Sequence, residues 1–487
     1  MGKTINIRCK NTGKTHKVPI GFTLEEVYDL LEIQMPYGAT SAKVNNKTEG
    51  LHFMFFNDKD VEFLDITSPS GMRTYTRSLF FVLYKAVSDL YPEMRLKIGT
   101  PVSNGYYCEI EEADGAASQT ADTLEQRRDK IRARMQEIID ADMAFHRITC
   151  PTDEAIRLFR QKGLEDKAKL LEGIGSLYTH YYTLGDTIDY FYGSLLIRTS
   201  QIRLFDIINY GDGLLLRVPD PENPTQLKPM REQSKMFDVL RQQHRWQDIL
   251  GVSTVGELNA ANAAGYSNDL IQVSEALQEK NIARIADTIA SNPQLKVILI
   301  AGPSSSGKTT FSKRLSVQLI ACGLRPIAIS LDDYFVNRED TPRLPNGEYD
   351  YENVEAMNIP LFNAQMNALL QGEEVELPSF NFITGRREWH GHILQLHEDS
   401  VIIVEGLHAL NPAMLPEDVE PHLIFRLYVS PLLPLNLDNH NRIPTSYLRL
   451  LRRIVRDYET RNSSVQRTLS MWASVQRGER RWIFPYQ

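Results

Sequence analysis

The pattern of apolar and polar residues predicts a small α+β module at the start of the chain. Short runs that alternate between apolar and polar residues, such as residues 4–8, predict β-strands. Residues 23–33 have the spacing of an amphipathic helix, and Thr23 and Glu26 at its start fit a capping box. We assign residues 1–66 to this module.

The next stretch, residues 67–215, mixes the two periodicities. Helical spacing is found in residues 77–91 and again in residues 122–144, with a strand pair expected around residues 105–110. The second helix carries charges of both signs, which is typical of a solvated face. These features predict a second α+β domain, separate from the first.

A proline-rich stretch, residues 218–229, ends this domain. Proline excludes a helix and a central strand, so we predict a linker or a long surface loop here. Residues 232–292 then have a mostly helical pattern. We therefore assign residues 216–292 to a linker and helical connector, and residues 293–487 to a further domain.

Continuous apolar runs dominate this last domain. Residues 297–301, 326–330 and 401–404 are apolar nearly throughout, as is typical of strands that are buried on both faces of a parallel sheet. A helical segment follows the first run. The pattern predicts an α/β fold, a parallel sheet flanked by helices.

The composition sets outer bounds on the class of protein. At 487 residues the chain exceeds what one core usually supports, and its 42% hydrophobic and 24% charged residues are typical of soluble globular proteins. The net charge of −8 disfavours nucleic acid as the main partner. The four scattered cysteines indicate a reducing, cytoplasmic location, and no apolar run is long enough to cross a membrane.

A phosphate-binding loop follows the first apolar run. Residues 302–309 read Gly-Pro-Ser-Ser-Ser-Gly-Lys-Thr, between a predicted strand and a predicted helix. Its glycines let backbone amides approach phosphates, Lys308 neutralises the β and γ oxygens, and the Thr309 hydroxyl binds Mg²⁺. The predicted ATP-binding residues are Gly302, Pro303, Ser304, Ser305, Ser306, Gly307, Lys308, Thr309 and Thr310.

Acidic residues follow the other two apolar runs. Asp332 and Asp333 come at the carboxyl end of a predicted strand, where open α/β sheets place ligands. Either carboxylate is a candidate base for phosphoryl transfer to an alcohol. Glu405 ends residues 401–404 in a Walker-B arrangement, which places a carboxylate beside Mg²⁺. ATP and Mg²⁺ are the expected cofactors, with Thr309 and Glu405 as metal ligands.

Arginines crowd one predicted helix near the C-terminus. Their spacing puts several of them on one face, which favours a lid over a polyphosphate. The alternative is a solvated helix in which the arginines pair with Asp457 and Glu459. The arginines are Arg449, Arg452, Arg453, Arg456 and Arg461.

Residues 296–487 resemble the uridine kinase/phosphoribulokinase family. The resemblance lies in the stretches GPSSSGKTT, ISLDDYF, YDYE, LPSFNF and IVEGLHAL. It implies an ATP-dependent kinase that phosphorylates the 5′-hydroxyl of uridine or a related nucleoside in pyrimidine salvage, with Asp332 as the base. It also implies a set of substrate-binding residues, namely Asp350, Phe380, Phe382, Arg456 and Arg461.

The sequence departs from this family at three points. Phe380-Asn381-Phe382 stands where uridine kinases carry Tyr-Asp-Phe, and Gly385 stands where they carry a histidine. These departures concern the residues that contact the nucleobase, so the resemblance implies phosphorylation of the ribose without fixing which nucleobase is bound. By the same resemblance we expect a further strand and helix after Gln487, so that the sequence is truncated.

Residues 1–215 resemble the N-terminal half of threonyl-tRNA synthetases, a ubiquitin-like TGS module of β-grasp fold followed by an editing domain. The likeness is clearest in Leu90-Tyr91-Pro92 and Asn104-Gly105-Tyr106-Tyr107. The editing enzymes carry a His-x3-His pair and a Cys-x3-His pair, whereas this chain has Arg77, Phe81, Phe191 and Leu195 at those positions. The resemblance implies a degenerate domain that regulates, binds a ligand or supports homo-oligomer contacts.

Two alternatives to a nucleoside kinase remain open. A kinase of a sugar phosphate or a pantothenate-like alcohol has the same fold, and Arg386 and Arg387 beside Phe382 fit a phosphorylated acceptor. From another class, the N-terminal half fits an RNA- or tRNA-associated binding protein that is switched by nucleotide. The main expectation is a small-molecule nucleoside acceptor, with no membrane partner.

Overall fold

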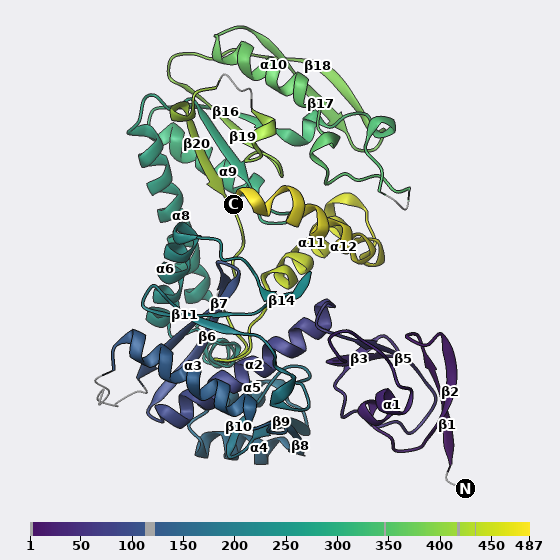
Figure 1. Cartoon of the computed structure of the whole chain (residues 1–487). Helices are drawn as coiled ribbons and strands as arrows, with labels where there is room; N and C mark the ends of the chain where they lie inside the picture. The colour runs from purple at the N-terminus through teal and green to yellow at the C-terminus, as the bar shows by residue number, and fades with distance from the viewer. Residues whose placement is uncertain (1–2, 113–121, 345–346, 416–418, 434) are drawn as a thin grey trace. The chain divides into compact units, whose positions relative to one another are not determined.

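The computed structural model describes residues 3–112, 122–344, 347–415, 419–433 and 435–487 (Figure 1). The chain divides into two compact units. Unit 1 comprises residues 1–266 and 434–443, and unit 2 comprises residues 267–433 and 444–487. The division after residue 266 falls inside the stretch predicted as linker and connector. Among the described residues, we find no helix of the length and apolar character that a bilayer span requires.

The first part of unit 1 is a mixed five-stranded sheet with one helix (Figure 1). Its elements are β1 (Thr4–Cys9), β2 (Lys14–Pro19), α1 (Leu24–Leu30), β3 (Ser41–Val44), β4 (Lys47–Glu49) and β5 (Lys59–Leu64). Alternate residues of β1 are buried, and the predicted capping box of Thr23 and Glu26 opens α1. The strand order β2-β1-β5-β3-β4, with β1 and β5 parallel, confirms the predicted β-grasp fold.

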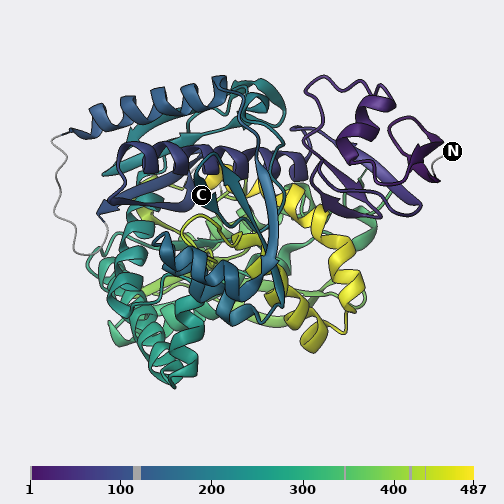
Figure 2. The same ribbon diagram turned by 90° about the horizontal axis from the view of Figure 1, so that it is seen from below.

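The second part of unit 1 is an α+β domain. Helices α2 (Pro69–Leu90) and α3 (Leu124–Asp140) run side by side (Figures 1 and 2) and share a core with a four-stranded antiparallel sheet. Helix α2 begins before the predicted residue 77, because Ser68 caps it and Pro69 fits its first turn. The sheet contains β6 (Met94–Val102), β7 (Gly105–Glu112), β11 (Asp206–Tyr210) and β12 (Gly213–Arg217).

A three-stranded sheet and two helices complete this domain. The strands are β8 (His146–Pro151), β9 (Tyr178–Leu184) and β10 (Thr187–Asp189), in the order β10-β9-β8. The helices are α4 (Thr152–Gln161) and α5 (Glu165–Ile174), and both contribute to one small core. The arrangement confirms the α+β class that the sequence predicts for this part of the chain.

The proline-rich stretch differs from the predicted loop. Strand β13 (Pro219–Asp220) pairs with β14 (Asn223–Leu227) in an antiparallel hairpin. A two-stranded hairpin contains only edge strands, which tolerate proline because many of their amides need no partner strand. The predicted helical stretch then follows as α6 (Ser234–Leu250) and α7 (Val255–Ala263) of unit 1 and α8 (Ser267–Ala290) of unit 2.

The core of unit 2 is a parallel four-stranded sheet in the order β16-β19-β15-β20. Its strands are β15 (Val297–Ala301), β16 (Arg325–Ser330), β19 (Ser400–Glu405) and β20 (Ile424–Tyr428). Helices α8 and α9 (Lys308–Ala321) pack on one face of the sheet and α10 (Ile359–Leu370) on the other. This confirms the predicted α/β fold with helices on both faces.

Further elements follow the strands of this sheet in the chain. Strands β17 (Val375–Asn381) and β18 (Arg386–Leu394) form an antiparallel hairpin, and a short 3₁₀ segment, η2 (Leu331–Tyr334), follows β16. Helices α11 (Thr445–Arg461) and α12 (Val465–Trp482) end the described chain, apart from one 3₁₀ turn. Parallel strands that end at one edge bring the segments after them together, so the predicted site residues are expected there.

Candidate nucleotide and acceptor site

The predicted phosphate-binding loop connects β15 to α9. Gly302 is buried, and a Cβ atom there would lie 2.1 Å from the carbonyl oxygen of Val429, so only glycine fits. Ser305 and Gly307 have φ angles of +60° and +98°, which turn the chain back into the helix. The loop therefore ends at the amino end of α9, where backbone N–H groups favour an anion.

Lys308 is the first residue of α9. Burial lowers the pKa of its ammonium group, while the carboxylates of Glu405, Asp332 and Glu352 act in the opposite direction. Three acids from three separate segments thus lie within electrostatic reach of one lysine. The fold brings together residues that lie far apart in the sequence, as a phosphoryl-transfer site requires.

Thr309 and Glu405 lie in direct contact. The Thr309 hydroxyl donates a hydrogen bond of 2.9 Å to Oε1 of Glu405 at the end of β19. Burial raises the pKa of Glu405, while Lys308 and the Thr309 hydroxyl lower it. Adjacent hydroxyl and carboxylate oxygens suit a hard cation that prefers oxygen ligands, so the two residues fit the predicted Mg²⁺.

Removal of the Thr309 hydroxyl tests this metal assignment. Thr309→Ala is expected to raise the Mg²⁺ concentration for half-maximal ATP turnover about tenfold, because one oxygen at the metal is lost. A Mg²⁺ titration of ADP release measures this. Thr288→Ala, on the exposed face of α8, is the control. An unchanged Mg²⁺ requirement in Thr309→Ala would contradict the assignment.

The two acids after β16 have different surroundings. The Asp333 carboxylate accepts a hydrogen bond of 3.1 Å from the backbone N–H of Phe380, and burial raises its pKa. Asp332 instead acts electrostatically on Lys308, Glu405 and Arg461. Asp333 therefore anchors the β17 hairpin, and Asp332 remains the predicted base.

Two buried arginines on α11 hold the helix to the phosphate-binding loop, and the exposed Arg452 adds a hydrogen bond of 3.1 Å from Nε to the carbonyl of Ser305. Arg449 donates to the carbonyl of Ser304 at 3.2 Å, and Arg453 donates to the hydroxyl of Ser304 at 2.9 Å. Both guanidinium groups are buried, and Arg449 pairs with Glu479 through both nitrogens. These arginines stabilise the loop, whereas the lid interpretation of the helix expects them to face a ligand.

Arg456 and Arg461 differ from the buried pair. Arg456 is half-buried and donates to Asp457 at 2.7 Å. Burial, together with the positive charge of Arg456, lowers the pKa of Arg461, while Asp457 and Asp332 oppose this shift. Arg461 thus lies within electrostatic reach of the candidate base and Arg456 within electrostatic reach of Lys308, which suits contact with a transferring phosphoryl group.

Glu479 and Glu352 belong to the site, and our reading of the sequence missed them. Glu479 is fully buried and accepts a hydrogen bond of 3.0 Å from the Ser304 backbone N–H, so it holds the loop from α12. Burial raises the pKa of Glu352 to about 7, and its Oε2 has no hydrogen-bond partner among the described residues. Glu352 lies two residues after Asp350 in the stretch YDYE, which was a usable signal, whereas no local pattern marks Glu479.

The predicted acceptor residues lie at the hairpin and at the segment before η4 (Val354–Ala356). The rings of Phe380 and Phe382 have centroids 5.2 Å apart, and Phe335 contacts both. Phe382 is exposed and so accessible to a ligand. Asp350 is half-buried and acts electrostatically on Glu352. The buried Oε2 of Glu352 has no hydrogen-bond partner among the described residues, which indicates a place for a ligand hydroxyl.

In unit 1 the four positions of the editing residues come together. The rings of Phe81 and Phe191 have centroids 5.4 Å apart, and both pack with Leu195 in the main core of the unit. Arg77 donates from Nε to the carbonyl of Ser194 at 3.0 Å. Apolar packing thus occupies three of these four positions, and the fourth holds an arginine that bonds to the backbone.

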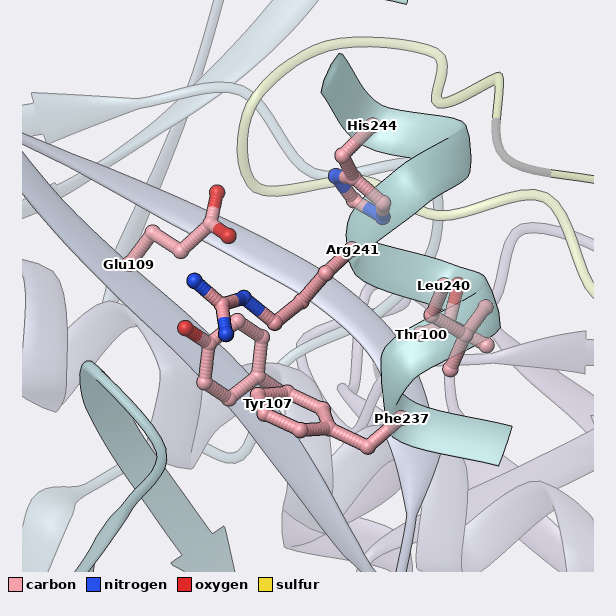
Figure 3. Close-up of a pocket in the computed structure, with 7 residues that line it drawn as sticks. All are labelled: Thr100, Tyr107, Glu109, Phe237, Leu240, Arg241 and His244. Atoms are coloured by element: carbon pink, nitrogen blue, oxygen red, sulfur yellow. The ribbon is translucent and has the colours of Figure 1, made fainter. Parts of the chain in front are cut away.

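A small cavity lies beneath α6 in unit 1 (Figure 3). Tyr107 and Phe237 meet there with ring centroids 4.8 Å apart, and burial raises the pKa of Glu109 to about 7. Figure 3 shows the Arg241 guanidinium between Glu109 and Tyr107. The cavity volume of about 10 Å³ suits about one water molecule, so this is a packing gap and too small for a ligand.

The parallel sheet, the phosphate-binding loop and the carboxylate at the end of β19 define a P-loop nucleotide-binding domain. Residues 297–486 match the family described as Phosphoribulokinase / Uridine kinase family. The C-terminal part of the chain thus resembles the kinases of this family.

The N-terminal half is similar to a different group of proteins. It is 26% identical over 206 residues to a threonine–tRNA ligase of Acetivibrio thermocellus, covering 42% of this chain and 31% of that protein. It is 31% identical over 170 residues to the corresponding ligase of Syntrophotalea carbinolica, covering 35% of this chain and 26% of that protein. The chain thus spans about a third of the length of these relatives.

Solved structures with similarity to this chain include three described as kinases. A candidate fructose transport system kinase of Silicibacter sp. TM1040 has a TM-score of 0.30 and 17% identity, over 41% of this chain and 94% of that one. A possible uridine kinase of Bacillus stearothermophilus has a TM-score of 0.24 and 23% identity, over 28% and 70%. D-glycerate 3-kinase of Cryptococcus neoformans has a TM-score of 0.21 and 18% identity, over 26% and 52%. Scores this low carry no argument about the acceptor.

Proposed function

We propose that unit 2 transfers the γ-phosphoryl group of ATP to the 5′-hydroxyl of a nucleoside, with uridine as the leading candidate. The observation that carries the proposal is the convergence of Asp332, Glu405 and Glu352 on Lys308. This cluster combines a group that neutralises phosphate with acids that can take up a proton or bind a metal ion. A nucleotide switch needs no base directed at an acceptor.

The proposed reaction assigns one role to each residue. Asp332 accepts the proton of the acceptor hydroxyl as that oxygen attacks the γ-phosphorus, and the bond from the γ-phosphorus to the bridging oxygen of ADP breaks. Lys308 and the amides at the start of α9 stabilise the negative charge on the phosphates. Arg456 and Arg461 complete the positive surroundings.

Mg²⁺ is the cofactor that Thr309 and Glu405 would hold. When bound, it neutralises charge on the β- and γ-phosphate oxygens. The protein contributes the oxygen ligands at the end of β19 and the enclosed position of Glu405, which keeps the carboxylate close to the loop. This role agrees with the predicted Walker-B arrangement.

The charges around the acceptor residues support a neutral acceptor over a phosphorylated one. Asp332, Asp350 and Glu352 are acids, and they repel an anion. The two arginines that would serve a sugar phosphate are engaged elsewhere. Arg386 pairs with Glu339 at 3.3 Å, and Arg387 donates to the carbonyl of Phe335 at 3.1 Å.

The rings of Phe380 and Phe382 support a flat acceptor group. Aromatic side chains stack on nucleobases without strict sequence preference, so the exposed ring of Phe382 suits the base of a nucleoside. The carboxyl groups of Asp350 and Glu352 can accept hydrogen bonds from the hydroxyls of a ribose. Together these features support a nucleoside over a pantothenate-like alcohol.

A coupled ADP-release screen across nucleosides, sugar phosphates and pantothenate tests the proposal. We expect uridine or a related nucleoside to raise ADP release at least about tenfold above the rate with ATP alone, because the acceptor supplies the attacking oxygen. Asp332→Ala supplies the background rate. If no nucleoside raises turnover above that of the variant, the nucleoside kinase proposal is lost.

A further inference from the structure

Residues 435–443 take an unexpected course through the molecule. In the sequence they lie between β20 and α11, which both belong to unit 2, yet they pack within unit 1. The chain leaves unit 2 after Leu433 and returns to it at Pro444. A detour of this kind costs conformational entropy, so specific contacts in unit 1 must compensate for it. We call residues 435–443 the docked segment.

A buried ionic cluster holds the centre of the docked segment. Nζ of Lys167 lies 2.7 Å from a carboxylate oxygen of Asp189 and 2.9 Å from one of Asp438, and all three side chains are fully buried. The ring of His440 contacts the second oxygen of Asp189 at 2.7 Å. Lys167 and Asp189 belong to unit 1, whereas Asp438 and His440 come from the docked segment.

The cluster is complete only when the docked segment is present. Burial lowers the pKa of Lys167, but the carboxylates of Asp189 and Asp438 outweigh this effect and raise it. Buried charges are destabilising unless they are paired and hydrogen-bonded. Without Asp438, the buried ammonium group of Lys167 would pair with the carboxylate of Asp189 alone. Unit 1 therefore contains part of a charge cluster that the docked segment completes.

Hydrogen bonds of a side-chain amide fix the orientation of the docked segment. Asn441 is buried, and its side chain donates to the carbonyl of Tyr190 at 2.7 Å and accepts from the N–H of Tyr192 at 3.0 Å. Asp438 accepts from the backbone N–H groups of His440 and Asn441, both at 2.9 Å. The acid thus shapes the turn of the segment as well as pairing with Lys167.

Backbone contacts extend the recognition to both sides. The N–H of Ile98 in β6 donates to the carbonyl of Asn439 at 2.8 Å, and the N–H of Asn439 donates to Asp166 at 2.8 Å. Asn436 bonds with the backbone of Ser253 at 3.2 Å and of Val255 at 2.9 Å. The docked segment therefore forms hydrogen bonds with four parts of unit 1: β6, α5, the residues after β10 and the connection between α6 and α7.

The docked segment leads directly into α11. That helix begins at Thr445, and its arginines hold the phosphate-binding loop through Ser304 and Ser305. We propose that the N-terminal unit serves as a docking module for residues 435–443 of its own chain, and that this docking fixes the start of α11 and its arginine contacts with the phosphate-binding loop. This assigns the degenerate editing-like domain a positioning role in nucleotide binding.

Hydrogen exchange of the full-length protein tests the docking. Asp438→Asn removes the charge that pairs with Lys167 but keeps the shape of the side chain. We expect amide exchange in a peptide that covers residues 435–443 to accelerate at least about tenfold, while peptides from α2 and β15 are unchanged. Asp153→Asn, at an exposed position of α4, is the matched control and should exchange as the wild type does.

Nucleotide affinity tests the consequence for unit 2. Titration with a non-hydrolysable ATP analogue needs no acceptor, so its result does not depend on the proposed nucleoside specificity. We expect Asp438→Asn to weaken binding of the analogue about fivefold to tenfold, which is the lower part of the usual range of coupling between sites. Asn441→Ala, which loses the contacts with Tyr190 and Tyr192, is the second variant and should act in the same direction.

Three results would overturn this inference. Unchanged exchange in residues 435–443 of both variants would refute the docking contacts. Faster exchange there with unchanged analogue affinity would refute the positioning role. Exchange that rises equally in α2 and β15 would show that the variants unfold the chain as a whole, which contradicts a local docking module.

Discussion

Asp332→Asn is expected to lower the kcat for phosphoryl transfer about 100-fold to 10,000-fold, the range usual for loss of a general base. The amide has nearly the same shape but cannot take up the proton of the acceptor hydroxyl. Because Asp332 is proposed to take up the acceptor proton and is not one of the proposed ATP or Mg²⁺ ligands, the affinity for ATP should stay within about twofold of wild type. Steady-state kinetics with saturating nucleoside and a nucleotide-binding titration measure the two quantities.

The neighbouring acid supplies a matched control. Asp333 holds the backbone N–H of Phe380 through a carboxylate oxygen, and an asparagine oxygen can accept the same hydrogen bond. Asp333→Asn should therefore retain most of the wild-type kcat. If Asp333→Asn lost as much activity as Asp332→Asn, our assignment of the base to Asp332 would be wrong.

Lys308→Met is expected to reduce kcat/KM for ATP about 100-fold to 1,000-fold, as removal of one preorganised charge from a transition state does. Methionine preserves the apolar stem but leaves the acids Glu405, Asp332 and Glu352 without their common cation. Rates at several ATP concentrations measure the loss. The melting temperature of each variant separates this effect from general destabilisation.

Lys313→Met is the control for the lysine prediction. Lys313 lies on the same helix but is exposed, so its loss changes the charge of α9 without touching the loop. Its kcat/KM should equal that of wild type within experimental scatter. Equal losses in the two variants would indicate that the charge of the helix matters and the position of Lys308 does not.

The sequence predicts much of this fold for identifiable physical reasons. Three apolar runs ending in a loop or an acid predict the parallel sheet. The structure buries β15 and nearly all of β19, whereas β16 lies at the edge of the sheet and only its Ile329 is buried. The capping box at Thr23 marks the start of α1 directly. The phosphate-binding loop can be recognised in the sequence because its backbone conformation requires glycine at fixed positions. At Gly302, for example, a side chain would collide with the backbone of Val429.

Features that depend on distant contacts were not predictable in this way. Glu479 holds the loop from a helix far along the chain, and no pattern around it signals that role. The arginines of α11 share one helical spacing, yet Arg449 and Arg453 are buried structural groups. Nothing near Asp438 in the sequence indicates that its partner is Lys167 in unit 1.

The N-terminal half illustrates how a domain can keep a fold while its site changes. The four editing positions remain neighbours, but Phe81, Phe191 and Leu195 belong to an apolar core. The same domain has a fully buried lysine that pairs with an acid of the docked segment. This pairing is the contact on which the proposed positioning role of unit 1 rests.

Identification of the phosphorylated product tests the nucleoside kinase proposal most directly. The wild-type protein is incubated with ATP, Mg²⁺ and uridine, and the products are separated and analysed by mass spectrometry and phosphorus NMR. Our account predicts that uridine 5′-monophosphate forms in equal amount with ADP, and that Asp332→Asn forms almost none. ADP release without any phosphorylated nucleoside, across uridine and related nucleosides, would contradict it.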